Sequence, residues 1–104
     1  MRHYIDGGFY SIDNADLAVG YDRVLVITLP ARVPPMCVLS LDAAVNVLRG
    51  RGARVEIVHP DDATQAVFAS VGANLLDPTV REGAACAGRD QGRSVGPHVS
   101  SLWR

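Results

Sequence analysis

The chain has 104 residues, of which 48% are hydrophobic and 20% are charged, a balance that argues against disorder and suits one globular domain. Ten basic and eleven acidic side chains leave a net charge of −1, so neither a nucleic-acid partner nor a polybasic membrane anchor is expected. Residues 1–6 lack the apolar core of a signal peptide, and no apolar stretch approaches the roughly 20 residues that span a bilayer.

Two short apolar runs predict buried strands. Residues 23–29 are rich in β-branched side chains and stop at Pro30, and residues 54–58 repeat the pattern before Pro60. An unbroken apolar run, rather than an alternating one, is typical of a parallel strand that is covered on both faces. Residues 3–5, directly before Asp6, are a third and weaker strand candidate.

Four helical segments alternate with these runs, and each follows a residue type that caps helices. The caps and helices are Asp13 or Asn14 before 15–19, Ser40 before 41–49, Asp61 or Asp62 before a helix to 71, and Asp77 before a helix that opens at Pro78. Glycines 20, 50 and 72 follow the first three helices as stops. The last helix meets several glycines and Pro97, which leaves its far end undefined.

The resulting order is strand, helix, strand, helix, strand, helix, helix. This alternation predicts an α/β fold with a short, mostly parallel sheet flanked by helices. Residues 30–38 are the longest loop candidate, because Pro34-Pro35 continues neither a helix nor a strand. Met36, Val38 and Leu39 beside it could contact lipid, although inward packing is favoured.

Asp6-Gly7-Gly8 is the most informative tripeptide, because it stands where the first strand would end. In open α/β sheets, functional groups gather beyond the carboxyl ends of the strands. A carboxylate there can polarise a nucleophile, and two glycines keep bulk away from the reacting atoms. Asp-Gly is also a common turn signal, so the spacing alone favours a simple turn.

The surroundings of this tripeptide carry a resemblance to a known family. Residues 4–27 combine Asp6-Gly7-Gly8, Asn14, a short expected helix and an apolar strand, an arrangement that resembles the second catalytic block of the patatin-like phospholipases. Residues 55–61, 74–78, 88–92 and Leu102-Trp103 resemble the tail of bacterial members of this family. The resemblance implies that residues 1–104 are the C-terminal part of a patatin-like phospholipase domain, with part of that family's three-layer α/β fold.

The resemblance implies a Ser–Asp dyad that hydrolyses fatty acyl esters such as phospholipids in lipid metabolism. Asp6 would be the catalytic base, and Gly7 and Gly8 would shape the turn that places it. The family's serine lies in a Gly-x-Ser-x-Gly elbow, and none of the serines here (Ser11, Ser40, Ser70, Ser94, Ser100 and Ser101) has that context. A glycine-rich oxyanion loop is missing as well, so the chain is expected to be inactive alone.

Other candidate residues favour structural roles. His59-Pro60-Asp61-Asp62 could be half of a metal site, but a strand end followed by a helix cap is favoured. His3 and His98 are scattered, and Arg49-Gly50-Arg51-Gly52 is typical of a helix end with solvated arginines. Cys37 and Cys86 are expected to be ordinary thiols. No cofactor and no metal are predicted.

Three hypotheses remain open from the sequence. The first is the distal part of a hydrolase whose serine comes from a complementary N-terminal half. The second is a non-catalytic α/β module that binds or regulates a full-length relative. The third is a small α/β protein of unrelated activity in which Asp6 is a turn residue. The expected location is cytoplasmic or peripheral to the membrane.

Overall fold

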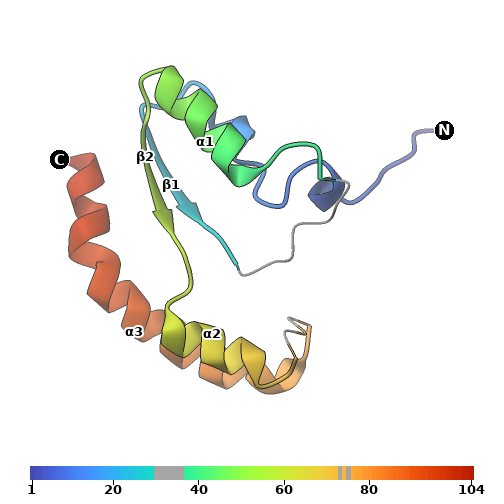
Figure 1. Cartoon of the computed structure of the whole chain (residues 1–104), viewed down its shortest axis with the longest axis vertical. Coiled ribbons are helices and arrows are strands. Elements are labelled where there is room, and N and C mark those ends of the chain that lie inside the picture. Colours follow the sequence, from blue (N-terminus) through green and yellow to red (C-terminus); the bar gives the residue numbers. More distant parts are fainter. Residues whose placement is uncertain (30–36, 73, 75) are drawn as a thin grey trace. The chain divides into compact units, whose positions relative to one another are not determined.

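The computed structural model describes residues 1–29, 37–72, 74 and 76–104, and it divides into two compact units, Met1–Val58 and His59–Arg104 (Figure 1). Each unit is described below by itself. Most of the expected loop at 30–38, including Met36, lies outside the described residues. Val38, the last residue of this loop, is 75% exposed, and Leu39 directly after it packs against the core.

The unit Met1–Val58 is built on a two-stranded parallel sheet. Strand β1 (Arg23–Ile27) pairs with β2 (Arg54–Val58), with Arg23 opposite Arg54 and Ile27 opposite Val58. The apolar runs predict both strands correctly. They also predict coverage of both faces, and within this unit one face is covered, where Val24 and Val26 are buried.

The expected strand at residues 3–5 is absent. These residues form no regular element, and Tyr4 and Ile5 are each 82% exposed. A run of three residues is too short to hold an extended conformation without a neighbouring strand. In the described chain, β1 pairs with β2 alone, and residues 3–5 pair with neither strand.

Helix α1 (Leu41–Gly50) covers the buried face of the sheet (Figure 1). Its predicted cap is confirmed, because the Ser40 hydroxyl accepts a hydrogen bond from the Ala43 N–H at 3.2 Å. Its apolar stripe completes the core with the sheet. The core residues are Ala15, Val24, Val26, Ala44, Val45, Leu48 and Val55.

The end of α1 corrects one expectation. Gly50 is the last helical residue rather than the C′ residue, and Gly52 takes the left-handed conformation with φ of 91°. Such a conformation favours glycine because a Cβ would clash with the backbone. The chain therefore turns from α1 toward β2 at Gly52.

The segment before β1 is helical, as expected, but in the tighter 3₁₀ form. Helix η2 (Ala15–Ala18) follows Asn14, which lies in the left-handed region with φ of 49° and makes no side-chain cap. Gly20 stops the segment with φ of 101°. Ala15 and Ala18 bring this short helix against α1 and the core.

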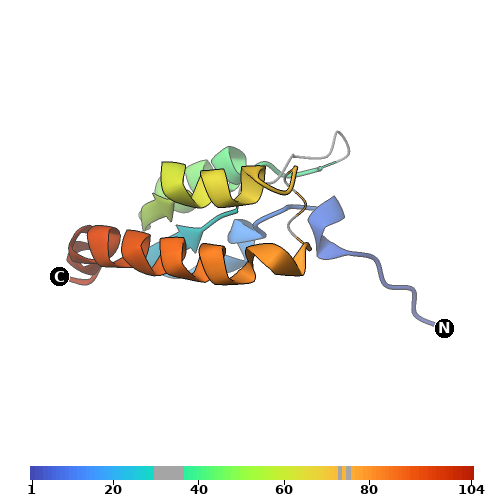
Figure 2. The ribbon, with the colours of Figure 1, turned by 90° about the horizontal axis from the view of Figure 1, so that it is seen from below.

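The unit His59–Arg104 is a helical hairpin. Helix α2 (Asp62–Ala69) is capped by Asp61, as predicted, and η3 (Pro78–Val80) opens directly into α3 (Arg81–Ser100), which is followed by η4 (Ser101–Trp103). A Cβ built on Gly83, near the start of α3, would lie 3.3 Å from Val67 near the end of α2. Helices α2 and α3 therefore run antiparallel and in close contact (Figure 2).

One side chain ties the middle of α3 to the start of α2. The Gln91 side chain of α3 donates to the His59 carbonyl, and its Oε1 accepts from the Asp61 N–H at 3.2 Å. The hydroxyl of the buried Thr64 reaches the same oxygen at 3.4 Å. Helix α3 itself continues through its glycines and Pro97 without a buried residue. The chain is thus α/β, with three α-helices and a short parallel sheet among the described residues.

Candidate functional site

Asp6 and its glycines form a tight turn that the Asp6 side chain itself stabilises. Asp6 is the N-cap of the 3₁₀ helix η1 (Gly7–Phe9), and its Oδ1 accepts the Gly8 N–H at 2.7 Å. The Asp6 carbonyl accepts the Phe9 N–H at 3.1 Å. The expected turn is present, and it fixes one oxygen of an exposed carboxylate.

The second carboxylate oxygen of Asp6 accepts from no group within the described residues. Gly8 suits this arrangement, because a Cβ at that position would lie 3.1 Å from Asp6 Oδ1, closer than ordinary van der Waals contact. A side chain at position 8 would require the carboxylate to shift by a few tenths of an ångström. The glycine therefore holds the carboxylate close to the backbone and leaves Oδ2 open to solvent.

Asp6 does not stand at the end of a strand. The residues before it are irregular, and the carboxyl ends of β1 and β2 are formed by Ile27 and Val58. The sequence predicted the turn correctly but placed it after a strand that the structure lacks.

Ser11, the serine nearest to Asp6 in sequence, is occupied by the fold. It is 1% exposed, its Oγ accepts the Asn14 N–H at 3.0 Å, and its carbonyl accepts Asn14 Nδ2 at 2.7 Å. Position 7 is close to the same amide, since a Cβ on Gly7 would lie 3.7 Å from Asn14 Nδ2. Asn14 therefore holds the backbone at Ser11, which follows the Asp6 turn, through two hydrogen bonds. The buried Ser11 hydroxyl is not accessible to an ester.

The serines at helix ends are likewise engaged with backbone. The Ser70 hydroxyl donates to the Val67 carbonyl at 2.6 Å, and Ser100 and Ser101 donate to the Pro97 and His98 carbonyls at 2.9 and 2.6 Å. Ser40 caps α1. These four hydroxyls therefore serve helix ends, which agrees with the missing elbow motif.

Tyr10 and Asp16 form a polar contact that the sequence did not predict. The Tyr10 hydroxyl donates to Asp16 Oδ2 at 3.4 Å, and the buried Asp16 Oδ1 has no hydrogen-bond partner among the described residues. Asp16 lies in the 3₁₀ helix η2, six residues after Tyr10. Helical periodicity at 3.6 residues per turn gives no signal for it.

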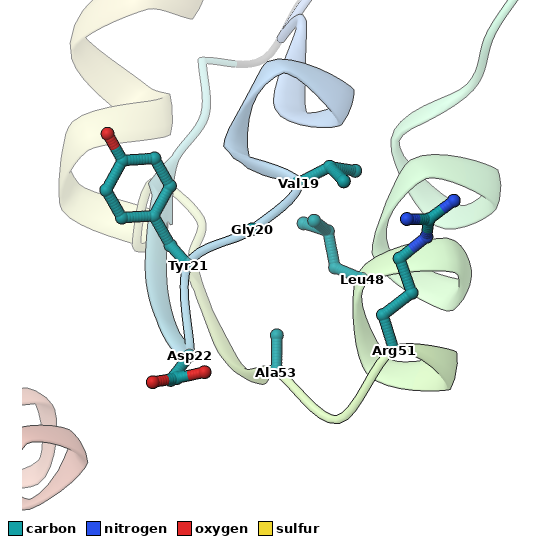
Figure 3. Close-up of a pocket in the computed structure, with 7 residues that line it drawn as sticks. All are labelled: Val19, Gly20, Tyr21, Asp22, Leu48, Arg51 and Ala53. Atoms are coloured by element: carbon teal, nitrogen blue, oxygen red, sulfur yellow. The ribbon is translucent and has the colours of Figure 1, made fainter.

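A shallow hollow of about 350 Å³ lies between the start of β1 and the end of α1 (Figure 3). Val19 and Leu48 point toward one another there, with Arg51 beside them, whereas Tyr21 and Asp22 point away (Figure 3). Its lining residues are Val19, Gly20, Tyr21, Asp22, Leu48, Arg51 and Ala53. None of them belongs to the Asp6 turn, and the lining holds neither serine, cysteine nor histidine.

Of the remaining candidates, Arg49 has a structural role. Arg49 of the Arg-Gly-Arg-Gly sequence donates from Nη2 to the Val55 carbonyl at 3.0 Å. His3 is exposed, and Cys37 and Cys86 are free thiols. Within the described ranges, no group of three or more His, Cys, Asp or Glu side chains is placed to hold a metal ion.

Two capping carboxylates have lowered pKa values. The Thr64 backbone N–H, at 2.9 Å from Asp61 Oδ1, and the Thr64 hydroxyl lower the pKa of Asp61 below its ordinary value. The hydroxyl and the N–H of Thr79 lower the pKa of Asp77 in the same way. Both pKa values are lowered because the carboxylate caps a helix. Asp61 is therefore a helix cap, as the sequence predicts for residues 59–62.

Comparison of the chain with protein-family models, with curated proteins and with solved structures finds no match. In the described part of the chain, no helix is long and apolar enough to cross a membrane. The resemblance to the patatin-like family therefore depends on the motif residues around Asp6 and along the tail.

Proposed function

We propose that the chain is the aspartate-bearing C-terminal part of a patatin-like lipid acyl hydrolase, with Asp6 as the base of a Ser–Asp dyad. A complementary N-terminal half would supply the serine and the oxyanion donors. The partial three-layer fold is part of the proposal, and the β1–α1–β2 segment is the piece of it that this chain would contribute. Its substrates would be fatty acyl esters, including phospholipids, at a membrane surface.

The observation that carries the proposal is the state of the Asp6 carboxylate. Oδ1 is held by the Gly8 N–H at 2.7 Å, whereas Oδ2 is exposed and has no donor within the described residues. A base that acts directly on serine needs one oxygen for orientation and one for the hydroxyl proton. The side-chain-free Gly7 and Gly8 leave room for the incoming serine and ester.

The proposed reaction uses the two carboxylate oxygens of Asp6 for different purposes, Oδ1 for orientation and Oδ2 for proton transfer. Asp6 Oδ2 would accept the serine proton while the serine oxygen attacks the ester carbonyl, and Asp6 would then pass that proton to the leaving alcohol as the tetrahedral intermediate collapses. Water would then attack the acyl-serine, with Asp6 again taking a proton, and fatty acid would be released as the proton returns to the serine. In such a pair, residues 3–5 would extend as a strand and bring Asp6 to a sheet edge.

The test is reconstitution. The reading frame immediately upstream of Met1 should encode Gly-x-Ser-x-Gly, and its product, co-expressed with this chain, should hydrolyse a long-chain p-nitrophenyl ester. With either part alone, the ester should hydrolyse no faster than it does in buffer. An upstream region without that motif, or a co-expressed pair without esterase activity, would remove the support for the split enzyme.

A non-catalytic binding module is the second candidate, and the exposed face of β1 favours it. Ile27 is 73% exposed on a strand that the sequence predicts to be covered. This alternative would be supported if no reconstituted pair hydrolysed the ester and if the chain bound a partner specifically through β1.

A further inference from the structure

Asn14 adopts a backbone conformation that a side chain normally disfavours. Its φ is 49° and its ψ is 33°, in the left-handed region, and among the described residues it is the one non-glycine residue with positive φ. L residues avoid this region because the Cβ crowds the backbone, and asparagine enters it where its short amide side chain binds nearby backbone groups. Such a conformation persists where the surrounding contacts fix it. The contacts of Asn14 therefore indicate what it holds.

The two hydrogen bonds that Asn14 donates both end on the buried Ser11. The Asn14 N–H donates to Ser11 Oγ at 3.0 Å, and Asn14 Nδ2 donates to the Ser11 carbonyl at 2.7 Å. Because Ser11 is 1% exposed, removal of the amide would leave its carbonyl buried without that donor, which is unfavourable. The left-handed conformation of Asn14 is thus accompanied by two bonds that reach three residues back.

Ser11 is connected in turn to the Asp6 turn through Gly7. The Ser11 N–H donates to the Gly7 carbonyl at 3.2 Å, and the Tyr10 N–H donates to the same carbonyl at 3.0 Å. The Asn14 amide also lies beside Gly7, since a Cβ built on Gly7 would be 3.7 Å from Asn14 Nδ2. Gly7 shares a peptide bond with Asp6, so a fixed Gly7 carbonyl limits the rotation of the Asp6 turn.

The chain that follows Asn14 joins it to the hydrophobic core. Ala15, the next residue, is 6% exposed and belongs to the core cluster of the unit Met1–Val58. The Leu17 N–H donates to the Asn14 carbonyl at 3.1 Å and begins helix η2 directly after Asn14. Asn14 therefore stands between the core and Asp6, and its hydrogen bonds lead to the Asp6 turn through Ser11 and Gly7.

We propose that Asn14 is a positioning residue for the Asp6 carboxylate. Through Ser11 and Gly7 it fixes the turn in which Asp6 Oδ1 accepts the Gly8 N–H at 2.7 Å, and it thereby sets the direction of Oδ2. Asn14 acts through other residues and takes no part in the proton transfer. The catalytic value of this position rests on the proposed acyl-hydrolase function, whereas the position itself is a property of the chain alone.

A simple turn residue would need only the left-handed backbone. Glycine adopts that backbone at no steric cost, so Asn14→Gly keeps the turn and removes the amide that binds Ser11. Asn14→Asp keeps the size of the side chain, but it replaces the Nδ2 donor by an oxygen that repels the Ser11 carbonyl. The matched control is the adjacent Asp13→Asn, because the Asp13 side chain makes no hydrogen bond within the described residues.

The test on the chain alone is NMR measurement of the three-bond Hα–Hβ couplings of Asp6, which report whether its side chain keeps one χ1 rotamer. The parent and Asp13→Asn should show the couplings of a single rotamer, whereas Asn14→Gly and Asn14→Asp should show couplings averaged over several. Averaged couplings in the parent, or parent couplings in both Asn14 variants, would overturn the proposal. Loss of the parent circular dichroism spectrum in both Asn14 variants would assign Asn14 to the stability of the whole fold and overturn it as well.

The test on the co-expressed pair separates kcat from KM. Asn14→Gly should lower kcat by roughly 10²-fold and leave KM unchanged, because a misplaced base affects the transition state and not the binding of the ester. The Asp13→Asn pair should keep the parent rate, and a raised KM with the parent kcat for Asn14→Gly would contradict the positioning role. A parent pair without esterase activity would instead remove the acyl-hydrolase proposal, and the Asp6 couplings of the chain alone would still decide the role of Asn14.

Discussion

Replacement of Leu48 by alanine tests the core that positions the sheet. Leu48 is 1% exposed on α1 and belongs to the cluster that joins this helix to the sheet. A buried Leu→Ala change removes transfer free energy and leaves a cavity, at a cost of about 2–5 kcal/mol. Natural chains of this length have an unfolding free energy of roughly 5–15 kcal/mol, so the loss is a large fraction of the total.

The matched control is the adjacent residue. Val47 is 46% exposed on the same helix, and alanine at an exposed helical position has the higher helix propensity, so Val47→Ala should change the stability by less than about 0.5 kcal/mol. Urea unfolding followed by circular dichroism measures both. With a slope of about 1–3 kcal/mol per molar urea, Leu48→Ala should lower the midpoint by roughly 1–2 M. Similar midpoints for the two variants would refute the assignment of the core.

Three further changes test local features of the fold. Gly52→Ala should destabilise the chain by about 1–2 kcal/mol, because φ at this position is 91°. Gly50→Ala should instead stabilise it by up to about 1 kcal/mol, because Gly50 is helical and nothing lies within 4 Å of an added Cβ. Thermal unfolding compares the two variants, and a stabilising Gly52→Ala would contradict the described turn. The hydrogen bonds from Thr64 lower the pKa of Asp61 from 3.8. The stabilisation that this cap contributes is therefore present above pH 3.8 and is lost as the pH falls through the lower pKa of the folded state. An NMR titration of the Asp61 carboxyl group should give a midpoint below 3.8, and a midpoint above 3.8 would contradict the cap. Gly8→Ala should displace the Asp6 carboxylate by a few tenths of an ångström and weaken its hydrogen bond to the backbone N–H, since the added Cβ would lie 3.1 Å from Oδ1. The carboxyl carbon chemical shift of Asp6 reports this change, and an unchanged shift would contradict the turn geometry.

The sequence predicted the elements whose signals are local. Ser40 and Asp61 cap the helices that follow them because a side-chain oxygen reaches a backbone N–H three residues on. The two apolar runs became β1 and β2 because each is followed by a proline and because a helix of sufficient length separates them to allow parallel pairing. These features require no knowledge of distant parts of the chain.

The features that the sequence missed depend on non-local contacts or on small shifts in helix geometry. Residues 3–5 have a strand-like composition, but a strand also needs a neighbour, and within the described chain these residues pair with none. Helix α1 ends one residue later than expected, because Gly50 adopts helical φ and ψ while Gly52 takes the left-handed turn. Helix α3 continues through Pro97, which normally disfavours a helix interior, and the local sequence gives no signal for this continuation.

The candidate site was predicted in part. Asp6, Gly7 and Gly8 do form the expected turn, since the Asp–Gly preference acts within four residues. The Tyr10–Asp16 contact was not predicted, because no local pattern indicates a contact between residues six apart in an irregular segment. The role of Asp6 as a base stays a prediction, because the serine that it would activate is not in this chain.

The most direct test of the central proposal is the ester-hydrolysis rate of the co-expressed pair when Asp6 is replaced by asparagine. Asparagine keeps the shape of the side chain and removes its ability to accept the serine proton, so Asp6→Asn should lower kcat on the order of 10⁴-fold. The control Asp22→Asn, at another exposed carboxylate of the same unit, should keep the parent rate. Equal rates for the Asp6→Asn variant and the parent pair would contradict the account.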